Sequence, residues 1–544
     1  MELAVLVSDP LSEEGLAVLR RDPRIRIDVK TWLPPEQLLQ VIGEYDGLIV
    51  RSQTKVTEAV LEAGKRLKIV GRAGVGVDNI DVPAATRRGI LVVNAPEGNT
   101  IAAAELTMAL LLAVARHVPQ AYVSLVKEKK WDRHSFMGVQ LQGKVLGVLG
   151  LGRIGTAVAR RAQSFEMRVL AYDPFVSAER ASELGIELGD VDTICREADF
   201  ITVHTPLTPQ TRGLINRERI QMMKPTVRLI NCARGGIIDE EALAEALASG
   251  RIAGAALDVF GKEPATDSPL LDLPNLVATP HLGASTREAQ VNVAIDVAED
   301  FLRFAAGEPV RNPVNAPALR PEVAAVLEPY RQLAQRLGRL YATIVGKVYP
   351  GIQVVYRGPV TRYDLRPLTT AALVGMLEPF LHEEINLVNA PILAEERGIR
   401  LAEVREGEGR TGTGAGPGGE NGSTISIRVQ TENGVRSVSG TVTTAVAAGT
   451  PTPRLTEIDG YRVDIVSSGY LLLSYHMDQP GIIGRVGTIL GKHNINIAYM
   501  QVGRKESRGG RAVMAMGIDD PVPTEVLQEI SRVPGLEATY LTEW

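Results

Sequence analysis

The sequence predicts an α/β protein in which two doubly wound parallel-sheet domains that form a cleft are followed by two α+β modules. Short apolar runs alternate with helix-like segments over residues 1–98 and again from Val145 to about residue 282. A glycine-rich turn lies near the start of the second alternation. From about Leu471 to Trp544 the order is strand, helix, strand, strand, helix, strand. Alternation places helices on both faces of a parallel sheet, whereas the tail order fits a ferredoxin-like βαββαβ module.

Length and composition narrow the class of protein. A chain of 544 residues is too long for one hydrophobic core. Its net charge of −5 argues against a nucleic-acid-binding protein. Two cysteines, Cys195 and Cys232, offer no disulfide framework, and the N-terminus reads as a strand, so we expect a cytoplasmic protein without a signal peptide. The apolar stretch 101–115 is interrupted by Glu105 and is shorter than the roughly 20 residues of a membrane span, which indicates a buried helix.

Four domains are expected along the chain. The first combines residues 1–98 and 283–315, the second is 99–282, the third is 316–455 and the fourth is 470–544. We expect Asn99 or Thr100 to cap the apolar helix, which should pack between two domains, and a further helix at about 286–306. The stretch 406–422 is so rich in glycine that we expect a mobile loop.

The turn GLGRIG (Gly150, Leu151, Gly152, Arg153, Ile154, Gly155) follows the strand-like run VLGVLG and opens a helix. In such a turn one glycine allows the tight bend, one lets the backbone approach a pyrophosphate, and one allows close helix–strand packing. Asp173 ends the next strand, 23 residues after Gly150. An acid there can hydrogen-bond the adenosine ribose and repels a 2′-phosphate, so NAD is favoured over NADP.

Three later segments place polar groups where strands end: NCARGGIIDE (231–240), LDVFGKEP (257–264) and TPHLGAST (279–286). Oxidising a 2-hydroxy acid requires a cation for the carboxylate and a base for the hydroxyl proton. Arg234 fits the cation and His281 the base, and Glu263 can orient the imidazole and stabilise its charged form. Taken singly, each residue is more often structural or a surface charge. We expect no metal site.

Together these segments resemble the signature segments of the D-isomer-specific 2-hydroxyacid dehydrogenase family, over about residues 1–315. The resemblance implies that Arg234, Glu263 and His281 are the catalytic set. It also implies cofactor contacts from Gly150, Gly152, Arg153, Ile154, Gly155, Asp173, Thr205, Cys232, Ala233, Arg234, Asp258, His281, Gly283 and Ala284. Cys232 would then be part of the cofactor wall and not a nucleophile.

Substrate specificity is expected from the first domain. The strings GLIVRSQTKV and GRAGVGVDNID resemble those of the family members that act on 3-phosphoglycerate. This resemblance implies that the substrate carboxylate and phosphate are held by Arg51, Ser52, Arg72, Gly74 and Val75. Arg133, in WDRHSFMG, resembles a residue that the neighbouring subunit supplies, which would make the active site dependent on a homo-oligomer.

The C-terminal half resembles regulatory modules of the same family members. The segment LSYHMDQPGIIGRVGTILGKHNINIAYMQVGR is similar to ACT domains that bind L-serine, and the resemblance implies ligand contacts from His476, Asp478 and Asn496 between two paired modules. The middle region resembles an allosteric substrate-binding domain, from which it departs at the Gly-rich stretch 406–422. The family resemblance favours a tetramer over a dimer.

Three functional hypotheses follow. The leading one is NAD-dependent oxidation of 3-phospho-D-glycerate to 3-phosphohydroxypyruvate, which opens L-serine synthesis and is regulated by serine. The second is a broader D-2-hydroxy acid dehydrogenase, including reduction of 2-oxoglutarate. The third is an NADH-sensing regulator that keeps the fold without turnover, against which the presence of Arg234, Glu263 and His281 argues.

Overall fold

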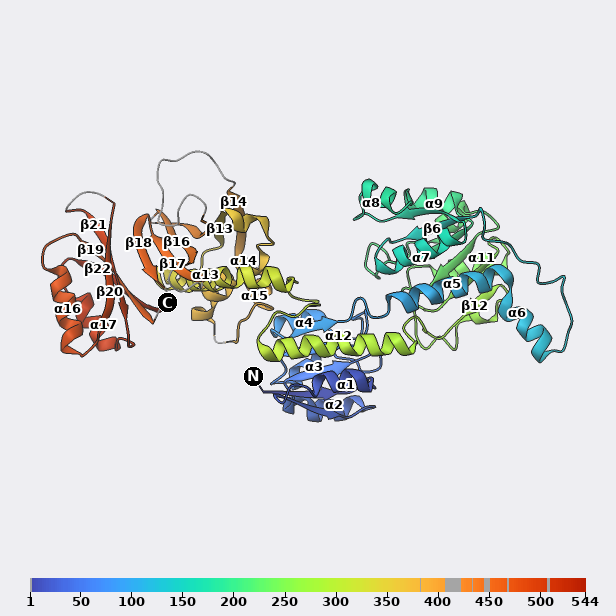
Figure 1. Cartoon of the computed structure of the whole chain (residues 1–544), viewed down its shortest axis with the longest axis horizontal. Helices are drawn as coiled ribbons and strands as arrows, with labels where there is room; N and C mark the ends of the chain where they lie inside the picture. Colours follow the sequence, from blue (N-terminus) through green and yellow to red (C-terminus); the bar gives the residue numbers. More distant parts are fainter. Residues whose placement is uncertain are drawn as a thin grey trace.

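The computed structural model describes residues 2–381, 383–406, 422–432, 434–444, 451–466, 469–505 and 509–544. The described residues form four sheets, of five, seven, six and four strands, in that order along the chain (Figure 1). The first two sheets are parallel throughout, so the predicted pair of doubly wound units is confirmed.

The first domain is built on a sheet of order β2-β1-β3-β4-β5. Its strands are β1 (Leu3–Val7), β2 (Ile25–Val29), β3 (Gly47–Val50), β4 (Ile69–Arg72) and β5 (Leu91–Asn94). Its helices are α1 (Glu13–Leu19), α2 (Pro35–Val41), η1 (Ile42–Glu44), α3 (Glu58–Ala63), α4 (Val82–Arg87) and the later α12 (Arg287–Ala306). Phe301 of α12 is fully buried against β3 and β4, where Gly47 and Gly71 leave room for its ring. The segment after residue 282 therefore completes the core of the N-terminal sheet.

The second domain has the order β12-β11-β10-β9-β6-β7-β8, which reverses direction between β9 and β6. Its strands are β6 (Val145–Leu149), β7 (Arg168–Tyr172), β8 (Glu187–Leu188), β9 (Phe200–Val203), β10 (Arg228–Asn231), β11 (Gly254–Leu257) and β12 (Leu276–Ala278). Its helices are α5 (Thr100–Arg116), α6 (Val118–Tyr122), η2 (Val123–Lys127), α7 (Arg153–Ser164), α8 (Ala178–Glu183), α9 (Val191–Glu197), α10 (Arg217–Met222), α11 (Glu240–Ala248) and η3 (Pro269–Asp272). Open α/β sheets bind ligands at such a reversal, beyond the carboxyl ends of the strands.

The third domain is a mixed sheet of order β14-β13-β15-β16-β17-β18. Its strands are β13 (Gly351–Arg357), β14 (Arg400–Glu406), β15 (Thr424–Thr431), β16 (Gly434–Thr444), β17 (Pro451–Ile458) and β18 (Tyr461–Val466). Its helices are α13 (Pro321–Val345), η4 (Pro359–Arg362), α14 (Arg366–Leu377), η5 (Glu378–Phe380) and α15 (Ala390–Glu396). The sheet continues to Val466, past the boundary expected at residue 455.

The fourth domain is an antiparallel sheet of order β20-β21-β19-β22. Its elements are β19 (Tyr470–Met477), α16 (Ile482–Lys492), β20 (Ile497–Arg504), β21 (Arg511–Ile518), α17 (Thr524–Ser531) and β22 (Leu536–Glu543). The predicted βαββαβ order is confirmed. Leu471, Val513 and Trp544 share one core with the third domain, so the two modules pack side by side (Figure 1).

Two local expectations have different outcomes. Asn99 lies at the N-cap position of α5, but its side chain makes no capping hydrogen bond and its Oδ1 is buried without a partner in the described part of the chain. Thr100 is already the first residue of the helix. The α5 helix packs against α7 and the seven-stranded sheet, and it meets α12 as well. Residues 407–421 of the Gly-rich stretch lie outside the described residues.

Among the described residues, no single helix is long and apolar enough to cross a membrane. Length and composition alone would admit one bent pair, Thr100–Arg116 with Val118–Lys127, which is bent by 64°.

Candidate active site

The glycine turn joins β6 to α7 at the point where the sheet order reverses. Gly150 has φ +102°, a backbone conformation that favours glycine. A Cβ on Gly155 would lie 1.9 Å from the Gly150 carbonyl oxygen, so a side chain there would force the helix away from the strand. Gly152 occupies the N-cap of α7, and a Cβ on it would meet no atom within 4 Å. The turn is therefore closed on its protein side and open on its outer side, where a pyrophosphate can approach the helix N-terminus.

Asp173 follows β7 and lies against this turn. Its Oδ2 accepts the Leu151 N–H at 2.8 Å, and its Oδ1 accepts the Phe175 N–H at 2.9 Å. The hydroxyl of Thr205 is buried without a hydrogen-bond partner among the described residues, and its methyl group lies next to Gly150. A fixed carboxylate and an unpaired buried hydroxyl beside an open glycine turn fit a dinucleotide with free ribose hydroxyls.

Arg153, the first residue of α7, forms an ion pair with Glu97 at 2.8 Å between Nη2 and Oε1. Both side chains are exposed. Glu97 precedes α5, in the connection between the first two domains. The ion pair therefore holds Arg153 at the edge of the glycine turn through a residue of that connection.

The loop after β10 presents Arg234. Asn231 shapes this loop, because its Nδ2 donates to the Arg234 carbonyl at 2.8 Å and its Oδ1 accepts the Ala233 N–H at 3.0 Å. A Cβ on Gly235 would lie 1.9 Å from the Phe260 carbonyl oxygen, so the loop packs directly on the backbone that leads to Glu263. These contacts bring two of the three predicted catalytic segments together.

The two cysteines are both buried, but only Cys232 lies in this loop. Burial raises the pKa of the Cys232 thiol to about 12, so it stays protonated at neutral pH. A protonated, buried thiol is a poor nucleophile.

Asp258, fully buried after β11, organises the segment that carries His281. Its carbonyl accepts the His281 N–H at 2.9 Å, and its carboxylate accepts the Leu282 N–H at 2.7 Å and the Gly283 N–H at 2.9 Å. The Thr279 hydroxyl donates to the same carboxylate at 2.6 Å. His281 itself has φ +55°, an uncommon conformation for a residue with a side chain, and this network fixes it. Asp258 thus supports the histidine backbone.

The imidazole of His281 contacts the carboxylate of Glu263. The distance from Nδ1 to Oε2 is 2.8 Å, and the other oxygen of Glu263, Oε1, accepts the Phe260 N–H at 3.1 Å. The two side chains are 49% and 38% exposed, and because the contact uses Nδ1, the other ring nitrogen of His281 is left free of this carboxylate. A histidine oriented through Nδ1 by a carboxylate is suited to exchange a proton through Nε2.

The first domain contributes two further arginines at the ends of adjacent strands. Arg51 follows β3, and its N–H donates to the buried carboxylate of Asp9 at 2.6 Å. It also lines a small pocket of about 110 Å³ with residues Pro10, Leu11, Ser12 and Gln290. Arg72 ends β4, and burial together with the neighbouring charge of Arg234 lowers its pKa to about 10. Buried like charges are costly, so the site is prepared for an anion.

For the other predicted residues, the structure gives a location but few contacts with the rest of the site. Gly74 and Val75 lie in the loop after β4, where a Cβ on Gly74 would collide with the Arg72 guanidinium. Ser52 is exposed beside Arg51, and Ile154 and Ala284 are half-buried near the glycine turn and the His281 segment. Arg133 lies in an exposed segment after η2, and the described contacts do not join it to the other site residues.

The three predicted effector residues belong to the fourth domain but do not lie together in it. His476 is level with Arg504, at the end of β20, whereas Asn496 directly precedes the start of that strand. They therefore lie at opposite ends of the four-stranded sheet. Asp478 forms an ion pair with Arg504 at 2.9 Å, and Asn496 donates to Asp519 at 2.7 Å. His476 is buried, and its Nδ1 has no partner in the described part of the chain.

Several residues that shape the site were not predicted. Asp78 and Asn79 follow the GVGV turn and contact Arg234 and Arg72, and Glu97 pairs with Arg153. The acid and the amide directly after a Gly-rich turn were the available signal for the first two. No sequence pattern separates Glu97 from any other surface glutamate.

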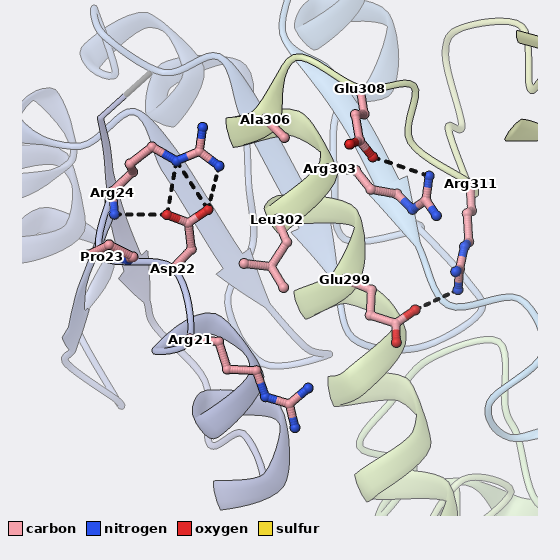
Figure 2. Close-up of a pocket in the computed structure, with 10 residues that line it drawn as sticks. All are labelled: Arg21, Asp22, Pro23, Arg24, Glu299, Leu302, Arg303, Ala306, Glu308 and Arg311. Carbon is pink, nitrogen blue, oxygen red and sulfur yellow. Dashed lines mark hydrogen bonds and ion pairs between the residues drawn. The ribbon is translucent and has the colours of Figure 1, made fainter. Parts of the chain in front are cut away.

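A separate pocket of about 560 Å³ lies on the first domain between residues 21–24 and the C-terminal half of α12 (Figure 2). Three of its four arginines face carboxylates: Arg24 contacts Asp22 at 2.6 Å, Arg311 contacts Glu299 at 2.5 Å, and Arg303 contacts Glu308 at 3.7 Å. Since its charges are largely compensated internally, we assign it no role in the reaction.

Three family models match the chain. Residues 108–283 match the NAD binding domain of D-isomer specific 2-hydroxyacid dehydrogenases, 326–459 match the D-3-phosphoglycerate dehydrogenase intervening domain, and 470–535 match the ACT domain. Among solved structures, a Thermus thermophilus protein superposes with a TM-score of 0.54 at 38% identity, over 57% of this chain and 100% of that one. D-lactate dehydrogenase from Aquifex aeolicus, complexed with NAD and lactic acid, gives 0.52 at 30% identity, over 58% and 100%.

Relatives match over nearly the whole length. D-3-phosphoglycerate dehydrogenase of Synechocystis is 47% identical over 98% of this chain and 94% of its own, and that of Archaeoglobus fulgidus is 46% identical over 99% and 100%. The enzyme of Bacillus subtilis is 44% identical over 99% of both chains. With the glycine turn, the Glu263–His281 pair and all three family models in place, the chain belongs to the D-3-phosphoglycerate dehydrogenase family.

Proposed function

We propose that this chain oxidises 3-phospho-D-glycerate to 3-phosphohydroxypyruvate with NAD⁺, the first step of L-serine biosynthesis. The observation that carries this proposal is the arginine cluster of Arg51, Arg72 and Arg234 beside the Glu263–His281 pair. A carboxylate and a phosphate at opposite ends of a three-carbon substrate together carry close to three negative charges. Three arginines offer ligands to both anionic groups, whereas a substrate with only a carboxylate would leave Arg72, whose pKa is lowered by burial and by Arg234, without an anionic ligand.

The residues divide the work as follows. Arg234 binds the substrate carboxylate, and Arg51 and Arg72 hold the phosphate. The C2 hydroxyl donates its proton to Nε2 of His281, while Glu263 holds Nδ1–H and stabilises the imidazolium that forms. The dinucleotide, when bound by Gly150, Gly152, Gly155 and Asp173, supplies the acceptor for the hydride that leaves C2. The reverse reaction returns the proton from His281 to the ketone oxygen.

The remaining cofactor contacts belong to this proposal as well. They come from Arg153, Ile154, Thr205, Cys232, Ala233, Asp258, Gly283 and Ala284, which lie in the glycine turn and in the loops after β9, β10, β11 and β12. The first domain, with 283–315, would hold the substrate, and 99–282 would hold NAD. Two reduced, buried cysteines support a cytoplasmic location.

The alternative readings are less well supported. A non-catalytic NADH sensor has no need of the 2.8 Å contact between His281 and Glu263 or of the network under Asp258. A dehydrogenase of simple 2-hydroxy acids would need one of the three arginines for the carboxylate, and one that acts on 2-hydroxyglutarate would need a second cation for the distal carboxylate, but neither substrate carries the double charge of a phosphate. We therefore favour the phosphorylated substrate.

A homo-oligomer is part of the proposal. Apolar side chains are exposed on α6, η2 and the segment after them: Val118, Tyr122, Val123, Leu125, Val126, Trp131 and Met137. A run of exposed apolar side chains along one segment fits a subunit interface, and Arg133 lies in the same segment, where a second copy could receive it. We propose a tetramer in which the ACT modules also pair, with L-serine bound between His476 and Asp478 of one module and Asn496 of another.

Steady-state kinetics on a substrate panel tests the substrate. We expect kcat/KM for 3-phospho-D-glycerate with NAD⁺ to exceed that for D-glycerate and D-2-hydroxyglutarate by at least about 100-fold, because neither of these substrates offers a phosphate to the guanidinium groups of Arg51 and Arg72. Equal kcat/KM values with and without the phosphate would refute the proposal. L-Serine added to the same assay tests the effector.

A further inference from the structure

Arg234 is held by a carboxylate from the opposite domain. Its Nε donates to Oδ2 of Asp78 at 3.0 Å, although the two residues are 156 positions apart and belong to different sheets. Asp78 is 68% exposed and Arg234 29% exposed on their side chains, so the pair lies at the edge of the cleft. Because the contact is made through Nε, the two terminal nitrogens of the guanidinium are not used by Asp78.

Of the two terminal nitrogens of the Arg234 guanidinium, only Nη1 has a hydrogen-bond partner among the described residues. Nη1 donates to the Ala233 carbonyl at 2.7 Å, and Nη2 rests over Gly76, where a Cβ would lie 1.8 Å away. In the described part of the chain Nη2 has no hydrogen-bond partner. With Nε occupied, the guanidinium plane is fixed while donors at its terminal edge stay free for a carboxylate.

The same short loop also contacts Arg72. Asn79, next to Asp78, accepts from Nε of Arg72 at 3.5 Å, and its own Nδ2 donates to the carbonyls of Arg51 and Thr54 at 2.7 Å each. The charge of Asp78 also opposes the lowering of the Arg72 pKa. One loop of the first domain therefore orders the cationic side chains of both domains.

We propose that Asp78 is a positioning residue for the reaction: it orients the Arg234 guanidinium across the cleft, so that the carboxylate-binding edge forms only when the two domains are apposed. Asp78 does not touch the substrate in this arrangement and acts through Arg234. The inference rests on the proposed role of Arg234 as the carboxylate ligand.

Kinetics of Asp78→Ala and Asp78→Asn test this. In Asp78→Ala we expect KM for 3-phospho-D-glycerate to rise and kcat/KM to fall by about 10- to 100-fold, the worth of one hydrogen bond to a charged group. Asp78→Asn keeps an oxygen that can accept from Nε and should recover much of this loss. The dissociation constant for NADH should change less than about twofold in either variant, because the glycine turn is untouched.

Two controls separate this role from others. Asp22→Ala removes a carboxylate that also pairs with an arginine of the first domain, Arg24, and it should leave kcat/KM unchanged. In an Arg234→Lys background, which lacks Nε, adding Asp78→Ala should cost much less than it does in the wild type. An equal cost in both backgrounds would overturn the inference, since Asp78 would then act elsewhere.

Other outcomes also decide the matter. A lower KM in Asp78→Ala would show that Asp78 competes with the substrate for Arg234, and an unchanged kcat/KM would show that the contact is incidental; either result overturns the inference. If Arg234→Lys itself keeps wild-type kcat/KM, the proposed function of Arg234 fails instead, so the two failures are distinguishable.

Discussion

Nδ1 of His281 lies 2.8 Å from Oε2 of Glu263, and the second oxygen of that carboxylate is held by the Phe260 N–H at 3.1 Å. The glutamate is therefore fixed at one oxygen by the backbone and orients the histidine with the other. Since the His281 backbone is itself fixed by Asp258, the imidazole is held at its backbone and at Nδ1, which leaves Nε2 for a substrate hydroxyl. This arrangement of a base and its orienting acid leads to the first prediction.

Removing either member of the pair should lower turnover without affecting the cofactor. In His281→Ala we expect kcat to fall by about 100- to 10,000-fold, because the hydroxyl proton loses its acceptor. In Glu263→Gln the fall should be about 10- to 1,000-fold, because the neutral amide no longer stabilises the imidazolium. Steady-state kinetics give both values, and fluorescence titration should show NADH binding unchanged.

A glutamate outside the site provides the control. Glu308→Gln removes a carboxylate that faces Arg303 on the outer surface and should leave kcat unchanged. Wild-type kcat in His281→Ala would exclude His281 as the base.

Part of this site could be predicted from the sequence for a physical reason. The glycine turn, Asp173 and the three polar segments follow strands, and the carboxyl ends of parallel strands converge on one edge of the sheet. What could not be predicted depends on contacts between distant segments. The pairing of Asp78 with Arg234 spans 156 positions, and neither residue's neighbours in sequence indicate it.

The fold also has some features that the local sequence predicts and others that it does not. The β6–α7 turn was predictable because each glycine has a local steric task, whereas β8, a two-residue edge strand at Glu187–Leu188, has no apolar alternation and was not expected. Asn99 likewise does not make the capping hydrogen bond that was expected of it. Residue type favoured a cap, but the backbone there (φ −112°, ψ 7°) does not aim the side chain at the helix N–H groups.

Replacing either of two glycines of the cofactor turn by alanine should have different effects: Gly155→Ala should lower stability, and Gly152→Ala should weaken NADH binding. In Gly155→Ala the new Cβ would lie 1.9 Å from the Gly150 carbonyl oxygen, so we expect destabilisation of about 1–3 kcal/mol and a lower Tm. In Gly152→Ala the Cβ meets no protein atom within 4 Å, so Tm should stay near the wild-type value. Because that Cβ lies on the open side of the turn, the dissociation constant for NADH should rise by at least about 10-fold.

Calorimetry and NADH titration on the two variants check this contrast. An unchanged affinity in a well-folded Gly152→Ala protein would show that the pyrophosphate does not approach that side of the turn.

Burial of His204 should make stability depend on pH. The pKa of this histidine is lowered from 6.5 to about 4 by burial, so it is neutral in the folded protein, and its Nε2 lies 3.0 Å from the Thr202 hydroxyl. The unfolded chain binds a proton below about pH 6.5, but the folded chain resists until about pH 4. The stabilisation is therefore complete above pH 6.5 and is lost as pH falls towards 4, by about 3 kcal/mol at most.

Thermal unfolding of the wild type and His204→Gln between pH 7.5 and 4.5 measures this effect. The difference in stability between the two proteins should shift in favour of the glutamine variant as the pH falls. A constant difference across that range would mean that His204 does not titrate between the two states.

The opposite placement of the effector residues leads to a prediction about pairs of chains. Because Asp478 and Asn496 lie at the two ends of one ACT sheet, a single module cannot offer both to one serine molecule, and a paired module must supply the second. Asp478→Ala and Asn496→Ala should therefore each abolish inhibition by L-serine. Mixed oligomers reassembled from the two variants should regain inhibition in part. In each mixed pair of modules, one serine site has both Asp478 and Asn496 intact, and the reciprocal site has neither. Inhibition that survives in either pure variant, or that fails to return on mixing, would contradict a site shared between modules.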